Sequence, residues 1–284
     1  MSSYIIKNAT IVNENNTFKS DVLIENEIIK EIATDIIASE SATIIDAKGK
    51  YLIPGFIDDQ VHFREPGLTH KANIATESKA AVAGGITTFI EQPNTVPQAT
   101  TQELLENKFK NYDEKGTFIK WNPAVKTEQD RLGLWEALLD DRIDVLATDH
   151  APHTIEEKNN VYTKAPSGGP LVQHAVTAIL EKVKEGVIPI EKAVEKMSHN
   201  PAKLFQIEKR GFVKEGYYAD LVLIDTNKSQ TVTKENILYK CGWSPFEGTT
   251  FSSTITHTFV NGNLMYNEGV FNEEIKGKRL TFDR

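Results

Sequence analysis

The sequence predicts an α/β fold in which strands and helices alternate between residues 51 and 204, with short β-strands before and after this stretch. Three observations lead to this prediction. Runs of β-branched residues separated by turns fill residues 1–50. Apolar strands then alternate with amphipathic segments, as in chains whose parallel strands are joined by helical crossovers. From Gly211 onward the chain returns to short strands.

The flanking β segments are predicted from period-two patterns that end at turn residues. The N-terminal strands are expected at Tyr4–Val12, Asp21–Ile24, Ile28–Ile32 and Thr43–Asp46, and the C-terminal strands at 219–225 and 254–263, the last as a hairpin. In the middle segment, strands are expected at 51–58, 86–90, 118–123 and 143–147. Helices are expected at 73–83, 101–110, 127–140, 171–185 and 190–197, with a short one from His199.

Polar residues follow each of the four middle strands. Parallel α/β folds collect their functional groups at the C-terminal ends of the strands. A soluble domain without a site there would rarely place His, Arg, Asn and Asp after every strand. The placement therefore favours an enzyme.

The composition and net charge limit the classes of molecule that this protein can bind as its main partner. Of 284 residues, 39% are hydrophobic and 25% charged, which is typical of a soluble globular protein. The net charge of -8 argues against nucleic acid or an anionic membrane as the main partner. The start lacks the pattern of a signal peptide and no run is long enough to span a membrane, so we expect a cytoplasmic protein. The single cysteine, Cys241, is expected to be a reduced thiol.

Gln60 and His62 are two residues apart at a strand end, so their side chains point to one face. Two histidines at this spacing would both bind one zinc ion, but Gln60 offers only an amide oxygen, a weak ligand. His62 is therefore either a metal ligand or a hydrogen-bonded structural histidine. Asp149 lies just after the strand expected at 143–147. It is either a metal ligand and general base, or an N-cap residue whose side chain caps the turn at 151–153.

Arg64 follows His62 by two residues and can bind a carboxylate through both of its terminal nitrogens. Asn94 and Asn122 lie beside prolines at strand ends and are either site residues or turn formers. Ser167 and Gly168 belong to a Gly/Pro-rich loop that suits either a lid or a connector.

Five stretches together resemble class I dihydroorotases of the amidohydrolase superfamily, and the resemblance covers nearly the whole chain. These stretches are 54–67, 83–95, 121–126, 147–153 and 216–222, and the first four are similar to barrel strands one, two, seven and eight of that family. Thr148-Asp149-His150-Ala151-Pro152-His153 is among its most specific signatures. The resemblance implies a TIM-type β/α barrel and a small β-sandwich module that both termini build.

The resemblance also implies a reaction, the zinc-dependent reversible hydrolysis of dihydroorotate to N-carbamoyl-aspartate in pyrimidine biosynthesis. Family members hold two zinc ions with a bridging hydroxide. The resemblance implies that His62, Asp149 and Gln60 are the metal ligands. It also implies that Asp149 is the catalytic general base. It implies a substrate-binding set of His62, Arg64, Asn94, Asn122, His153, Ser167 and Gly168.

Two departures from the family matter. Gln60 stands where most members have a histidine, and nothing matches the lysine or aspartate and the two histidines of strands four to six. A complete barrel takes about 250 residues, whereas only residues 51–210 are available here. We therefore expect a partial barrel of strands one, two, seven and eight over 51–210. Residues 1–50 and 211–284 would form the β module.

Three functions follow as hypotheses: dihydroorotase activity, an inactive dihydroorotase-like scaffold, or a related cyclic amidase such as an allantoinase or hydantoinase. Arg64 and Asn94 favour a substrate that carries a carboxylate. The missing ligands lead us to expect at most one zinc ion per chain and to doubt activity. An open half-barrel would expose apolar residues such as Ile57, Val61, Ile86, Phe89, Val145 and Ala147, so a homodimer is expected.

Overall fold

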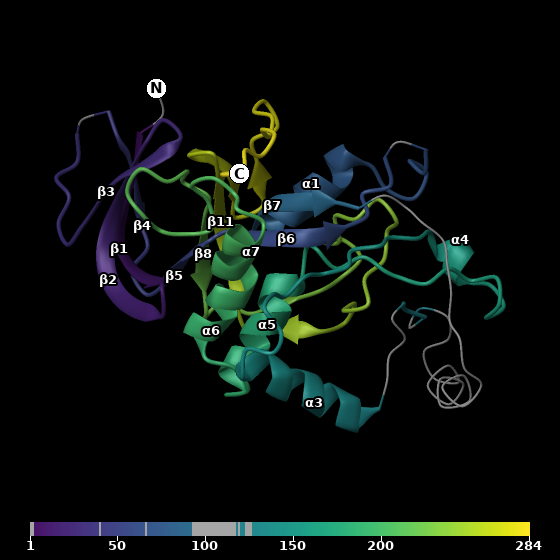
Figure 1. Cartoon of the computed structure of the whole chain (residues 1–284). Coiled ribbons are helices and arrows are strands. Elements are labelled where there is room, and N and C mark those ends of the chain that lie inside the picture. The colour runs from purple at the N-terminus through teal and green to yellow at the C-terminus, as the bar shows by residue number, and fades with distance from the viewer. Residues whose placement is uncertain (1–2, 40, 66, 93–117, 119, 123–126) are drawn as a thin grey trace.

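The computed structural model describes all residues except 1–2, 40, 66, 93–117, 119 and 123–126. A large twisted sheet forms one end of the molecule, and a smaller parallel sheet with helices around it forms the other (Figure 1). None of the helices in the described ranges has the length and apolar character needed to cross a membrane.

Nine strands form the large sheet, in the order β13-β12-β11-β8-β5-β1-β2-β3, with β4 paired to β1. Their bounds are Ser3–Asn13 (β1), Asn16–Glu25 (β2), Ile28–Ala33 (β3), Thr43–Asp46 (β4), Tyr51–Pro54 (β5), Leu221–Asp225 (β8), Thr254–Val260 (β11), Asn263–Asn267 (β12) and Val270–Phe271 (β13). The predicted flanking strands are thus confirmed, and strands from both ends of the chain meet where β5 pairs with β8. Hydrogen bonds join them in one continuous sheet, whereas a sandwich was expected.

The large sheet has its own apolar core. Ile11 of β1, Val22 of β2, Leu223 of β8 and Phe259 of β11 are fully buried in one cluster. Because these strands come from both ends of the sequence, the core holds the two ends of the chain together.

The chain leaves the large sheet at Gly55 and enters the parallel sheet. A Cβ on Gly55 would lie 2.1 Å from Thr87 Oγ1, so only glycine allows the strands to approach this closely. Strand β6 (Phe56–Val61) pairs in parallel with β7 (Ile86–Glu91), and helix α1 (Ile74–Ala83) connects them. This is the predicted strand–helix–strand unit.

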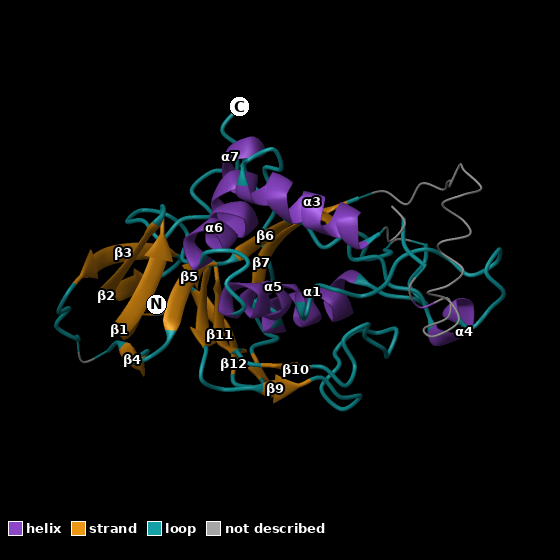
Figure 2. Ribbon diagram, turned by 90° about the horizontal axis from the view of Figure 1, so that it is seen from below, coloured by secondary structure: helices purple, strands orange, loops and turns teal. Residues whose placement is uncertain are grey.

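Most of the helices pack around the parallel sheet, whereas α4 (Ile155–Lys158) lies apart from it at the far end of the molecule (Figure 2). The further helical segments are α3 (Glu128–Leu139), α5 (Ala175–Lys184), α6 (Ile190–Val194), a π-helical turn (Glu195–His199) and α7 (Asn200–Leu204); β9 (Gln230–Thr231) and β10 (Thr250–Phe251) form a separate small hairpin. Phe56, Phe63 and Ile86 are buried against Val176 and Met197 of these helical segments. The predicted helices near 73–83, 127–140, 171–185 and 190–197 are confirmed with small shifts at their ends.

The strand predicted at 143–147 was wrong. Residues 143–149 have no regular structure, and only His150 forms an isolated parallel bridge with Val61. The backbone of this segment bonds to helical residues, because Leu146 N–H donates to Lys196 O and Asn200 Nδ2 donates to Asp144 O. The chain still runs beside β6, as a strand-eight position requires, but it lacks the strand ladder.

The strand predicted at 118–123 is also absent from the described residues of that range, which are irregular or lie in a short turn. The helix predicted at 101–110 lies outside the described residues. Among the described residues the parallel sheet therefore has only two strands, β6 and β7.

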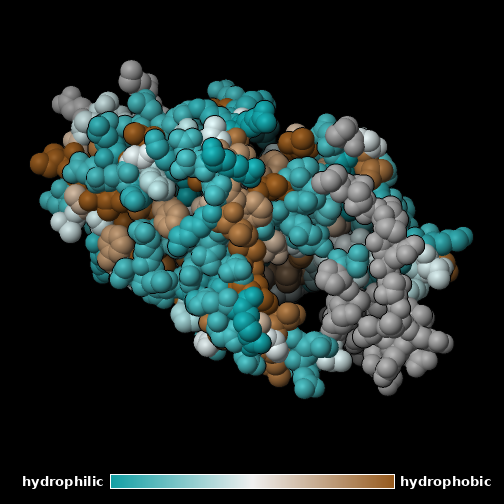
Figure 3. Space-filling model, in the orientation of Figure 1, coloured by the Kyte–Doolittle hydropathy of each residue, from teal (hydrophilic) through white to brown (hydrophobic). Residues whose placement is uncertain are grey.

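The apolar residues that are exposed differ from those expected for an open half-barrel. Ile57, Val61 and Ile86 are buried, so they are not uncovered as predicted, whereas Ala147 is exposed. Large exposed apolar side chains are spread over the molecule, from Ile37 (91% exposed) and Val270 (70%) to Leu134 of α3 (60%). Figure 3 shows a band of hydrophobic surface through the middle of one face of the molecule.

Candidate active site

Three predicted metal residues meet where β6 ends. His62 Nε2 lies 3.3 Å from Asp149 Oδ1, and Gln60 Nε2 donates to the same oxygen at 3.3 Å. Within the described residues Asp149 makes no capping hydrogen bond, so the alternative of a turn cap is wrong. The structure therefore brings Gln60, His62 and Asp149 together although Asp149 is far away in sequence.

A buried carboxylate positions Asp149. Asp58 Oδ1 accepts from Thr148 N–H at 3.1 Å and Asp58 Oδ2 accepts from Thr148 Oγ1 at 2.6 Å. His62 N–H also donates to His150 O at 2.7 Å. Burial raises the pKa of Asp58 to about 7. These bonds fix the turn that carries Asp149 against the end of β6.

The described residues do not fit a zinc centre. Zinc needs three or four good protein ligands, and the described chain holds no group of three His, Cys, Asp or Glu side chains that could bind a metal. His62 and Asp149 supply two ligands, and the amide of Gln60 is a weak third. His62 Nδ1 is buried and has no hydrogen-bond partner among the described residues, whereas a metal-bound histidine usually donates its other ring N–H to a carboxylate or carbonyl that orients it.

A cationic cluster lies beside this site. The buried Arg64 donates from Nε to Pro152 O at 3.1 Å, and its Nη2 lies 3.1 Å from His153 Nε2. Lys71 Nζ lies 3.1 Å from the other ring nitrogen of His153 and 2.8 Å from Glu157. Burial and the charges of Arg64 and Lys71 lower the pKa of His153 to about 3, so this ring is neutral. The cluster suits a carboxylate.

Two site residues have a backbone conformation that L-residues seldom adopt. Arg64 has φ = 70° and Asp149 has φ = 48°. Asp tolerates this region through its short polar side chain, but Arg has no such compensation. Such strain is found mostly where the surrounding structure fixes a functional side chain.

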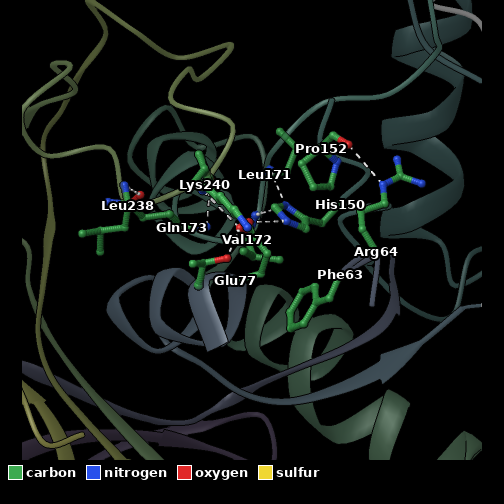
Figure 4. A network of polar contacts seen from close by, with 12 residues as sticks. Phe63, Arg64, Glu77, His150, Pro152, Leu171, Val172, Gln173, Leu238 and Lys240 are labelled. Atoms are coloured by element: carbon green, nitrogen blue, oxygen red, sulfur yellow. Dashed lines mark hydrogen bonds and ion pairs between the residues drawn. The ribbon is translucent and has the colours of Figure 1, made fainter. Parts of the chain in front are cut away.

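His150 is held in a buried network below the site (Figure 4). Its Nδ1 accepts from Leu171 N–H at 2.9 Å and Val172 N–H at 3.3 Å, so Nε2 must carry the proton. Nε2 lies 2.9 Å from the fully buried Glu77 Oε2, and Glu77 Oε1 accepts from Lys240 N–H at 3.2 Å. This network ties α1 to the turn that bears Asp149.

The remaining predicted residues lie at different distances from this centre. Ser167 O lies 2.9 Å from His153 Nε2, and Gly168 N–H donates to Lys120 O at 2.8 Å. A Cβ on Gly168 would lie 2.7 Å from Ala151 Cβ, so this loop packs closely against the turn that follows Asp149. Asn122 is exposed, and Asn94 lies outside the described residues.

Sequence reasoning missed Asp58, Lys71 and Glu77. Asp58 stands two residues before Gln60, in the stretch already singled out, and an acidic residue in a buried strand was the available signal. Lys71 and Glu77 lie in the connection to α1 and on it, where a charged side chain normally faces solvent. Their burial comes from partners on distant parts of the chain and left no local signal.

Comparison with known proteins supports the family resemblance. The model of the "Amidohydrolase family" matches residues 122–265, and a "Dihydro-orotase-like" model matches residues 49–129. A dihydroorotase of Endomicrobium trichonymphae is 37% identical over 205 residues, which are 70% of this chain and 47% of that protein. The chain thus spans about half the length of this relative.

A second alignment reveals a difference in length. The dihydroorotase of Bacillus subtilis is 26% identical over 425 positions, covering 94% of this chain and 99% of that protein. The alignment is longer than the 284 residues of this chain, so the relative contains residues that have no counterpart here.

A solved D-hydantoinase (dihydropyrimidinase) from Thermus sp. has a TM-score of 0.83 at 19% identity, covering 95% of this chain and 97% of that one. At this identity the likeness shows the fold. Since the amidohydrolase model covers half of the sequence and the fold agrees, this chain belongs to the amidohydrolase family.

Proposed function

We propose that this chain is a dihydroorotase, which hydrolyses the cyclic amide of dihydroorotate to N-carbamoyl-aspartate and catalyses the reverse reaction. The observation that carries the proposal is the convergence of Asp149 and His62 beside a cluster of Arg64, Lys71 and His153. Relatives that are 34–37% identical to this chain, among them those of Endomicrobium trichonymphae and Pyrococcus furiosus, are dihydroorotases.

Arg64 and His153 favour dihydroorotate over neutral cyclic amides. Dihydroorotate carries a carboxylate, and a buried guanidinium binds a carboxylate strongly when water is excluded. Arg64 is 7% exposed and its orientation is fixed by Pro152 O. Hydantoin-type rings without a carboxylate would leave this cation without a substrate partner.

Asp149 is the group we assign to proton transfer. It accepts a proton from the attacking water and delivers it to the ring nitrogen that leaves. Asp58 and Thr148 keep its backbone in place, and His62 positions its carboxylate from the opposite side. Zinc supplies hydroxide in relatives of this kind, but the described residues do not complete its ligand set, and no step is assigned to it here.

We further propose that the barrel is partial, with strands one, two, seven and eight. The alignment longer than the chain supports a missing internal segment, and the bridge between Val61 and His150 supports strand eight beside strand one. A half-barrel leaves strand edges open, so a homodimer is the state we assign to it.

The test is turnover in both directions with the purified chain, with and without added Zn²⁺. We expect turnover in the wild type, loss of turnover in Asp149→Asn, and no change in Lys48→Ala on the distant large sheet. Binding of dihydroorotate without turnover at any Zn²⁺ concentration would instead support the scaffold hypothesis, which the incomplete ligand set favours. Absence of both binding and turnover would refute the assignment.

A further inference from the structure

A cavity of about 260 Å³ lies between the end of α1, the start of α5 and strands β9 to β13. Its lining includes Ala83, His174, Glu235, Phe251, Ser253 and Tyr266, and it includes none of the residues of the candidate active site. The volume is below the roughly 300–1,000 Å³ of sites for drug-sized ligands, so a single ring is the right size. Cavities at the junction of two structural parts are common ligand sites.

His174 offers a hydrogen-bond donor to this cavity. The hydroxyl oxygen of Tyr239 accepts a hydrogen bond from Gln173 N–H at 2.9 Å. The hydroxyl proton of Tyr239 is then free to be donated to His174 Nδ1, which lies 3.2 Å away. Ser244 Oγ accepts from Phe246 N–H and lies 3.3 Å from the same Nδ1. Nδ1 is therefore the acceptor, and Nε2 carries the proton. Tyr239 and Ser244 do not line the cavity while His174 does, so the Nε2 edge of the ring is the one left for it.

His174 is neutral in the folded protein. Burial lowers its pKa to about 4. No hydrogen bond of Nε2 to another described residue is present, which leaves one N–H donor for a ligand. Phe251 stacks on this ring with the ring centres 6.1 Å apart, so the donor lies beside an aromatic wall.

Ser253 supplies a second donor. It is 2% exposed, and its Oγ is buried with no partner among the described residues. An unsatisfied buried hydroxyl costs about 1–3 kcal/mol. Because Ser253 lines the cavity, we infer that its hydroxyl can rotate about χ1 to meet a ligand acceptor there, which would satisfy it.

Glu235 adds a solvent-exposed carboxylate to the cavity lining. A hydrogen bond from Thr233 lowers the pKa of Glu235, so the carboxylate is charged. It can accept a hydrogen bond from an N–H group, and it repels an anion only weakly because solvent and salt screen exposed charges. Tyr266 and Phe271, with ring centres 5.1 Å apart, add aromatic surface to the lining. The cavity thus combines donors, an acceptor and aromatic rings.

We propose that this cavity is a second binding site, distinct from the candidate active site, for a small neutral planar ring that carries an amide. The amide carbonyl accepts from His174 Nε2 and Ser253 Oγ, the amide N–H faces Glu235, and the ring packs against Phe251 and Tyr266. The proposal goes beyond the hydrolase function and does not depend on it.

Benzamide is a suitable probe, and its binding to the full chain is measured by ligand-observed NMR titration. Benzoate has the same ring with a negative charge, and toluene has the ring without an acceptor. We expect saturable binding of benzamide that is tighter than that of either control. Ser253→Ala should weaken benzamide by about two- to tenfold, the range of one neutral hydrogen bond, without changing toluene. Glu235→Gln should strengthen benzoate only slightly.

Thr258→Val is the matched control variant. Thr258 Oγ1 is also buried with no hydrogen-bond partner in the described part of the chain, but Thr258 does not line the cavity, so benzamide should bind this variant like the wild type. Ala83→Leu fills the cavity and should abolish binding. The proposal is overturned if benzamide does not saturate the wild type, or if Ser253→Ala and Thr258→Val affect it equally. Because Ser253→Ala only removes one oxygen, the test stands even if Ala83→Leu fails to fold.

Discussion

Replacement of Glu77 by alanine tests the buried network below the candidate site. Glu77 and His150 are both fully buried, with Oε2 and Nε2 2.9 Å apart. Burial lowers the pKa of His150, and its Nδ1 accepts from Leu171 and Val172, so the ring is neutral and donates from Nε2. Glu77→Ala removes the acceptor for this proton and for Lys240 N–H.

The expected loss of unfolding free energy follows from these contacts. Each buried donor that loses its acceptor costs about 1–3 kcal/mol, and Glu77→Ala leaves two of them, His150 Nε2–H and Lys240 N–H, so we expect a loss of about 2–6 kcal/mol. Glu77→Gln keeps one carbonyl acceptor, so we expect a smaller loss of about 1–3 kcal/mol, the cost of one unsatisfied buried group. The order wild type, glutamine, alanine in stability is therefore the specific expectation.

Urea unfolding followed by circular dichroism at neutral pH measures these differences. Ser78→Ala on the same helix is the control and should change the unfolding free energy by about 0.5 kcal/mol or less. If Glu77→Ala unfolds within about 1 kcal/mol of the wild type, or if Glu77→Gln is as unstable as Glu77→Ala, the network does not hold the turn as we infer.

Four further predictions concern the site, the metal, the assembly and pH. Arg64→Ala should weaken dihydroorotate binding by roughly 2–5 kcal/mol in calorimetric titration, because a desolvated carboxylate loses its charged partner; equal affinities would remove Arg64 from the site. Metal analysis after dialysis should find at most one weakly held zinc ion per chain, since Gln60, His62 and Asp149 are the ligands available in the described structure; two tightly held ions would contradict this. Light scattering should show a dimer or larger assembly, and a monodisperse monomer that binds no apolar dye would contradict the open half-barrel. Unfolding free energy should fall as pH drops from 6.5 toward 4, because burial lowers the pKa of His174 from 6.5 to about 4 in the folded state and the unfolded chain takes up the proton first. The contribution of His174 to the unfolding free energy is fully present above pH 6.5 and amounts to roughly 3 kcal/mol. In His174→Gln the unfolding free energy should vary less between pH 4 and 6.5, and the same pH dependence as in the wild type would exclude His174 as the cause.

The sequence by itself determined the local elements and the kinds of residue in the site. The alternation of apolar residues predicted β1 to β4, β7 and most helices, because periodicity follows directly from strand and helix geometry. Gly84 and Gly85 gave the end of α1, which is confirmed at Ala83. The motifs around His62 and around Asp149 each indicated the family, because the residues within each motif are neighbours in the sequence.

Only the tertiary structure decided which distant residues meet. The apolar run at 143–147 predicted a strand, but its backbone bonds to Lys196 and Asn200 instead, since a strand forms only where a neighbouring strand offers a ladder. The pairing of Glu77 with His150 depends on burial of groups from separate parts of the chain. A local pattern specifies the preferred conformation of a segment, whereas the partners of its backbone and polar side chains are set by the packing of the whole chain.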